Sequence, residues 1–163
     1  MENISNTFKN ESLQMNRVSL KAGVYTAAGL VCYFVIMRLF NLHHYLELHY
    51  LNVIVLFLGL RYALQHIKQI TGEIRYFEGL KSGLIVTLIS VFLFNIFMLI
   101  YETLIDPPFL LFLKEKITLG PLFSVQETAV EIAGILVAEG LSSGFVLTFI
   151  LMQYYKSESS ETM

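Results

Sequence analysis

The chain has 163 residues and a net charge of −2, and 55% of its residues are hydrophobic while only 15% are charged. A typical soluble domain has about 25% charged residues, so this composition favours a membrane protein. The nearly balanced charge gives no indication of a nucleic-acid partner. The single cysteine, Cys32, excludes an internal disulfide.

Four apolar runs predict an all-α membrane protein with four transmembrane helices in an antiparallel bundle. The runs cover residues 19–39, 45–64, 82–101 and 129–154. The third run has 20 residues without Asp, Glu, Lys, Arg or His, and at about 1.5 Å per residue it matches the roughly 30 Å of a bilayer core. The second run is the weakest, because it crosses only if Arg61 reaches back to water along its flexible stem.

These spans divide the chain into an N-terminal segment (1–17), a transmembrane domain (18–155) and a polar tail (156–163). A tight turn at 40–44 joins the first two spans, and a basic amphipathic link at 61–81 has Gly72 as its expected break. Asp106-Pro107-Pro108 ends the third helix, since proline cannot continue it. The apolar residues of 109–116 then predict a short helix that lies in the membrane interface.

The distribution of Lys and Arg predicts the orientation, because cytoplasmic loops carry an excess of both. One side of the membrane would hold eight of them: Lys9, Arg17, Lys21, Arg61, Lys68, Arg75, Lys81 and Lys156. The other side would hold Arg38, Lys114 and Lys116. Both termini of this multi-pass protein are therefore expected in the cytoplasm.

Glu139 is the most unusual residue of the fourth span, because it lies near the expected midplane. An ionised carboxylate there costs about 2.5–3.5 kcal/mol on insertion scales, so we expect its side chain to face the protein interior. Asn95 on the third span lies at a similar depth and is a candidate partner. The pair would serve either as a hydrogen bond between helices or as a proton or cation site. Closer to the outer surface, Arg38 and Glu131 are expected to form an ion pair.

Two pairs of glycines have the spacing that allows helices to approach closely: Gly79 with Gly83, and Gly140 with Gly144. We expect them to serve packing within the chain rather than dimerisation.

The segment between the first two spans gathers four possible metal ligands: His43, His44, Glu47 and His49. Nitrogen and oxygen ligands of this kind suit zinc or copper. Histidine is also common at a membrane interface without any metal, and this simpler interpretation is favoured. The sequence therefore predicts no resident metal and no cofactor.

The central part of the chain, about 61–116, resembles a family of small four-span bacterial membrane proteins of unknown function, common in Bacteroidota. The similarity lies in segments 72–83 and 101–109. The matching residues are Phe77, Gly83, Ile105, Asp106, Pro107 and Phe109. The resemblance implies the four-span topology and a location in the cell envelope, and it implies no activity.

No nucleophile elbow, phosphate-binding glycine loop or metalloprotease motif appears in the sequence, so we do not expect an enzyme. The favoured function is an accessory or structural subunit that packs against lipids and against other membrane proteins or itself. The alternative is a small dimeric proton-coupled transporter that uses Glu139, by analogy with small multidrug exporters. A third hypothesis is a metal-handling protein that uses the histidines of residues 43–49.

Overall fold

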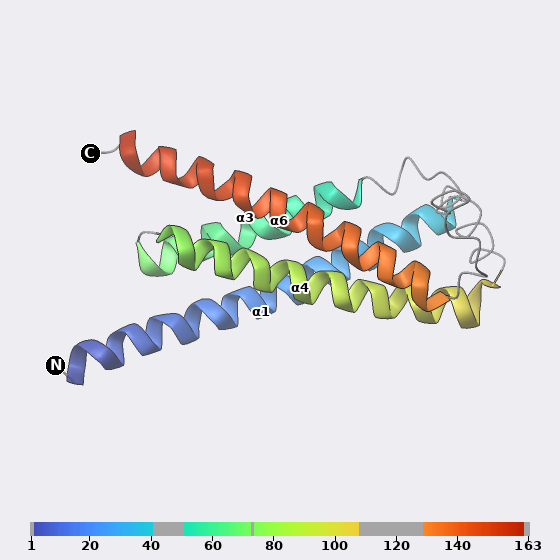
Figure 1. Ribbon diagram of the computed structural model, residues 1–163, viewed down its shortest axis with the longest axis horizontal. Coiled ribbons are helices and arrows are strands. Elements are labelled where there is room, and N and C mark those ends of the chain that lie inside the picture. Colours follow the sequence, from blue (N-terminus) through green and yellow to red (C-terminus); the bar gives the residue numbers. More distant parts are fainter. Residues whose placement is uncertain (1, 41–50, 73, 108–128, 162–163) are drawn as a thin grey trace.

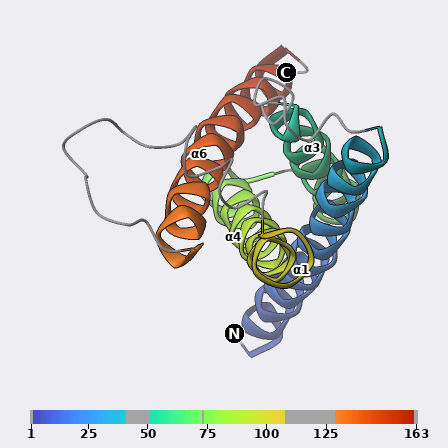
Figure 2. The same ribbon diagram turned by 90° about the vertical axis from the view of Figure 1, so that its right-hand side faces the viewer.

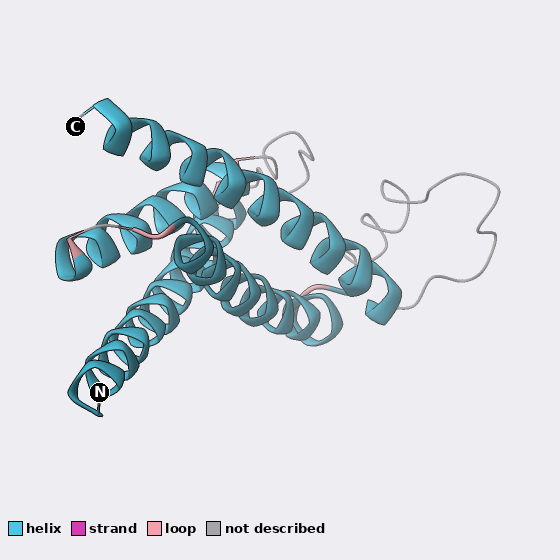
Figure 3. Cartoon of the chain, turned by 60° about the vertical axis from the view of Figure 1, so that its left-hand side comes forward, coloured by secondary structure: helices cyan, strands magenta, loops and turns pink. Residues whose placement is uncertain are grey.

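In the computed structural model, which describes residues 2–40, 51–72, 74–107 and 129–161, the chain is all-α, as the sequence predicts. The described elements are α1 (Glu2–Leu39), α3 (Asn52–Thr71), α4 (Tyr76–Ile100), a π-helical turn η1 (Tyr101–Ile105) and α6 (Ala129–Glu161) (Figure 1). Among the described residues only short loops separate the helices (Figure 3).

The helices form an up-and-down bundle with α4 in a central position. Helices α1 and α4 run in one direction, and α3 and α6 run in the other (Figure 1). Seen along its length, the bundle has α4 between α1 and α6 (Figure 2). Helix α3 contacts all three of the others. The central position of α4 agrees with its hydrophobicity, since it is apolar on every side and must be covered on several faces.

Three described helices are long and apolar enough to cross a membrane: Ser12–Leu39, Tyr76–Ile105 and Val130–Tyr155. Their mean hydropathies are 1.6, 2.6 and 2.0. Helix α3 is not among them, because its residues from Arg61 onward include Lys68 and several other polar side chains. The chain therefore has the helices of a membrane protein, with three strong candidate spans.

Helices α1, α4 and α6 are longer than the expected spans, whereas α3 has the 20 residues of the expected span 45–64 but lies further along the chain. The polar residues from Glu2 continue α1, and α3 runs on to Thr71, past the expected end at residue 64. The polar residues of α3 share the helix with the buried Leu60, Leu64 and Ile67, which makes this part of the helix amphipathic. The first half of the expected amphipathic link is therefore the end of α3. As predicted, the break comes at Gly72, whose φ of 79° is left-handed and favours glycine.

Small residues set the distance between α4 and α6. The facing pairs, α4 first, are Gly79 with Met152, Gly83 with Thr148, Thr87 with Gly144, and Val91 with Gly140. Each advance of four residues along α4 matches a retreat of four along α6, which is the register of antiparallel helices. A Cβ atom at Gly140 would lie only 2.9 Å from Val91 Cγ2. All four predicted packing glycines thus lie at one contact between two helices of the same chain.

The interior contains two apolar clusters and several buried hydroxyl groups. One cluster includes Leu60, Leu64, Val86 and Met152, and the other is built from Phe34, Met98, Tyr101 and Ile132. Three buried hydroxyls donate to the carbonyl one turn earlier in their own helix: Ser19 to Met15, Thr26 to Ala22, and Thr148 to Gly144. Such bonds allow serine and threonine to lie in an apolar interior without a partner on another helix.

Two predicted features fall outside the described residues. They are the histidine-rich segment with His43, His44, Glu47 and His49, and the interfacial helix expected at 109–116.

Candidate functional site

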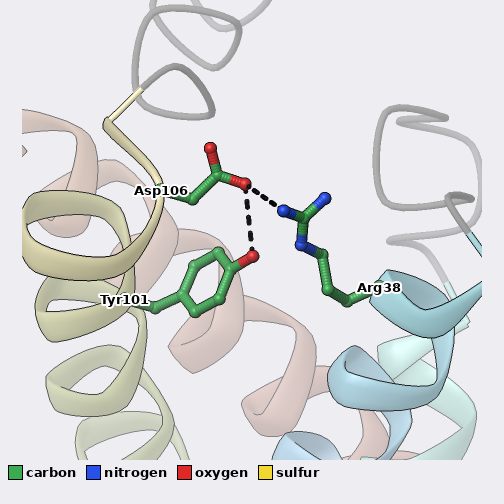
Figure 4. Close-up of polar contacts among 3 residues, drawn as sticks. All are labelled: Arg38, Tyr101 and Asp106. Carbon is green, nitrogen blue, oxygen red and sulfur yellow. Dashed lines mark hydrogen bonds and ion pairs between the residues drawn. The ribbon is translucent and has the colours of Figure 1, made fainter.

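The ends of α1 and α4 are joined by an ion pair, which we call the Arg38 cluster (Arg38, Tyr101 and Asp106; Figure 4). Arg38 Nη2 lies 3.0 Å from Asp106 Oδ2, and the Tyr101 hydroxyl donates a hydrogen bond of 3.3 Å to the same oxygen. The backbone N–H of Asp106 donates to the Tyr101 carbonyl at 2.9 Å and closes the π-helical turn. The cluster thus fixes the end of α1 against the end of η1.

Aromatic rings hold Tyr101 in position below this ion pair. Its ring meets Phe34 edge to face at 4.9 Å, and it stacks on Phe97 at 6.1 Å. Phe34 and Phe97 also meet edge to face, at 5.8 Å. These geometries are the preferred ones for aromatic pairs. The hydroxyl of Tyr101 can therefore reach Asp106 while its ring stays in the apolar core.

Glu102, the second residue of the π-helical turn, is a buried carboxyl group. Its side chain is 1% exposed, and its Oε1 has no hydrogen-bond partner among the described residues. Turns of this type are rare and often occur at functional sites. The sequence places Glu102 directly after the charge-free run, where a carboxylate normally meets water. Glu102 is buried because of the π-helical turn, and the periodicity of the sequence does not reveal such a turn.

The structure shows Arg38 in an ion pair with Asp106, a partner that was not expected, and the ion pair with Glu131 stays a prediction. Glu131 is exposed in the first turn of α6, where a carboxylate interacts favourably with the helix dipole. The sequence offers Asp106 as the end of the third helix and as part of the family resemblance, but not as a partner of Arg38.

Asn95 and Glu139 lie in different environments. Asn95 is buried, and its Nδ2 donates to the Val91 carbonyl at 3.1 Å while its Oδ1 has no partner in the described part of the chain. Glu139 is exposed and makes no side-chain hydrogen bond to Asn95. The reason is helix rotation: Gly140 faces Val91, so the residue before it is turned about 100° away. This corrects the expectation that Glu139 points inward toward Asn95.

Glu139 nevertheless lies close to the middle of the bundle in depth. Val91 is next to the midpoint of the span Tyr76–Ile105, and Gly140 packs on Val91. The exposed carboxylate is therefore level with the most apolar part of α4. Helix α6 is also the least covered of the three spans, with 22% of its apolar window buried against 39% for the other two.

Beside this face an open groove of about 500 Å³ runs between α4 and α6. Its walls are apolar except for the hydroxyl groups of Thr87 and Ser142. Leu88, Phe145 and Val146 line it and are each between 43% and 54% exposed. The groove and Glu139 lie on neighbouring parts of the same helix, because Ser142 follows Glu139 by one helical turn.

No group of three or more His, Cys, Asp or Glu side chains that could hold a metal ion occurs within the described residues.

Residues 21–157 match a family described as "Protein of unknown function (DUF4199)". The chain belongs to this family. The match extends from α1 into α6 and so includes Arg38, Glu102, Asp106 and Glu139, whereas the resemblance seen in the sequence covered only about 61–116. No curated protein and no solved structure matches the chain. The family relationship supports a shared fold of membrane-like helices and assigns no activity.

Proposed function

We propose that this DUF4199 chain is a non-enzymatic accessory subunit of a bacterial inner membrane that packs against another membrane protein through α6. The exposed Glu139 carries this proposal. A charged carboxylate facing lipid near the midplane costs about 2.5–3.5 kcal/mol, and intramembrane carboxylates nearly always face protein or water. In a monomer surrounded by lipid this cost has no compensation, whereas a protein partner on α6 offsets it.

The low coverage of α6 supports the same conclusion. Its exposed apolar side chains form a long surface: Val130, Phe145, Val146, Phe149 and Ile150. Lipid can solvate such side chains, so their exposure alone does not require a partner. Combined with a carboxylate at the same helix face, they favour a protein neighbour. The absence of catalytic motifs from the sequence agrees with a structural role.

The proposed topology has four crossings with both termini in the cytoplasm. Support for a crossing by α3 comes from its packing, because Leu60, Ala63 and Leu64 are fully buried within the bundle of spanning helices. Support for the orientation comes from the eight basic residues expected on one side against three on the other. Arg61 is exposed on α3 and would reach the aqueous boundary by extending its stem.

Photocrosslinking in native membranes tests the accessory role. A photoreactive benzoylphenylalanine replaces Val146 on α6 in one variant and Leu58 on α3 in a matched control, since the two side chains are 54% and 57% exposed. We expect a protein crosslink from position 146 and lipid adducts alone from position 58. Lipid adducts alone at both positions would refute the accessory role. A crosslink exclusively to a second copy would instead favour the dimeric transporter.

A further inference from the structure

We infer that the face of α6 around Glu139 receives one transmembrane helix of a different protein, and that this helix places a basic side chain beside the Glu139 carboxylate. This inference rests on the proposed accessory function and names the chemistry of the partner. It follows from the depth of Glu139, from the positions of the chain's own basic residues, and from the groove beside the carboxylate.

The depth of Glu139 determines which partner fits. The carboxylate belongs to the turn of α6 that packs on Val91, at the midpoint of the most apolar span. At this level neither water nor lipid headgroups are available to solvate a charge. A basic side chain on a neighbouring helix neutralises the carboxylate and hydrogen-bonds to it, which an apolar helix cannot do. Charge complementarity therefore specifies a Lys, Arg or His near the middle of the partner helix.

A second copy of this chain does not supply that group. A two-fold dimer through α6 would bring Glu139 close to Glu139 of the other copy, which places like charges together. Lys21 belongs to α1, and Figure 2 shows α1 separated from α6 by α4. An interface centred on α6 therefore excludes Lys21.

Arg61 is at the wrong level for the same interface. Lys68 of α3 lies over the ring of Tyr155 on α6, at 5.7 Å from its centroid. The two helices run in the same direction, and Arg61 and Thr148 each precede this contact by seven residues. Arg61 is therefore level with Thr148 along the bundle. Thr148 is nine residues from Glu139, or about 13 Å at 1.5 Å per residue. A dimer axis along the bundle preserves this offset. The positions of Lys21 and Arg61 in the described helices therefore favour a different protein as the source of the basic group.

The surface next to Glu139 has room for a closely packed helix. Position 134 is a glycine, and within the described residues no atom lies within 4 Å of where its Cβ would be; Ala138 follows one turn later. Small residues at such spacing let the backbone of another helix approach closely. On the side toward α4, the 500 Å³ groove can accept a bulky apolar side chain between Phe145 and Leu88. One helix can thus fill the groove and reach Glu139.

The test uses the full-length chain in native membranes, with benzoylphenylalanine at Val146 as the probe. Crosslinked peptides are identified by mass spectrometry, and the crosslink yield is measured for the parent chain and for Glu139→Leu, Glu139→Gln and the control Gln153→Leu. Gln153 is exposed near the end of the same helix, so the control removes a polar group without touching the midplane. Thermal unfolding of each purified variant checks that the fold is intact.

We expect the crosslinked peptide to be a transmembrane helix of another protein with Lys, Arg or His near its middle. Glu139→Leu and Glu139→Gln should each reduce the yield about tenfold, because removing one member of a buried ion pair leaves the other uncompensated. Gln153→Leu should leave the yield unchanged. The inference is overturned by a partner helix without a basic residue, by a yield that survives Glu139→Gln, or by a crosslink to a second copy. A complete lack of protein crosslinks would refute the accessory role itself.

Discussion

Thr87 on α4 lies directly against Gly144 on α6, so closely that a Cβ atom at position 144 would overlap its side chain. One turn away the roles are exchanged, because Thr148 on α6 lies against Gly83 on α4. Each threonine thus fills the space that the opposite glycine leaves free. This reciprocal arrangement fixes both the spacing and the register of the two helices, and it makes the glycines sensitive to substitution.

Gly144→Val should destabilise the purified protein by about 1–3 kcal/mol, because added methyl groups in a packed contact force the helices apart. The matched control is Gly134→Val on the same helix, where a Cβ would meet no atom of the described part of the chain within 4 Å. Thermal unfolding in detergent, followed by circular dichroism, measures both variants. We expect a lower Tm for Gly144→Val alone, and equal effects of the two variants would contradict the close contact.

The Arg38 cluster should contribute modestly to stability. The side chains of Arg38 and Asp106 are 41% and 12% exposed, so solvent screens part of their attraction. A double-mutant cycle with Arg38→Gln and Asp106→Asn should give a coupling energy of about 0.5–1 kcal/mol. Tyr101→Phe keeps the aromatic contacts and removes the hydroxyl group that donates a hydrogen bond to Asp106. Purely additive effects of the two charge substitutions would show that the ion pair does not hold the helix ends together.

The sequence predicts well those features that depend on composition and local spacing. Long apolar runs mark α4, which carries no charge from residue 82 to 101, and α6, which carries two glutamates from residue 129 to 154, since length and hydropathy alone decide whether a helix can cross a membrane. The left-handed conformation of Gly72 is likewise a local property. Gly83 and Gly144 could be selected because small residues four apart on an apolar helix let another helix backbone approach closely.

Features that depend on helix rotation could not be predicted. The direction of Glu139 follows from the contact of its neighbour Gly140 with Val91, and the spacing of Gly140 and Gly144 does not by itself identify the helix that they face. The partner of Arg38 depends on η1. In this turn the N–H of Asp106 donates to the carbonyl of Tyr101, five residues earlier, and this changes the direction of the chain at Asp106. The burial of Glu102 depends on the same turn.

Glu102→Met should raise the stability of the purified protein by about 1–3 kcal/mol. The buried Oε1 of Glu102 has no hydrogen-bond partner in the described chain, and methionine has a similar length without a polar group to desolvate. Glu102→Gln retains an unsatisfied polar group and should change the Tm little. Gln153→Met, at an exposed position, controls for the general effect of methionine. A lower Tm for Glu102→Met would mean that the carboxyl group is hydrogen-bonded in the folded protein.

The number of crossings can be decided at Gly72, the residue that ends α3. If α1 and α3 both cross, a reporter fused after Gly72 lies in the cytoplasm, on the same side as the N-terminus. If α3 stays on the outer side, the same fusion reports from outside. The burial of Leu60, Ala63 and Leu64 among the spanning helices makes us expect the cytoplasmic result.

Two further fusions complete this topology test, one after Lys116 and one at Met163. With four crossings the first should report from outside and the second from the cytoplasm. A fluorescent protein, active only in the cytoplasm, and a phosphatase, active only outside, provide opposite signals at each position. An external signal at both Gly72 and Met163 would leave three crossings, by α1, α4 and α6. Helix α3 would then be the element that does not span, because Arg61 and Lys68 place two charges within its length.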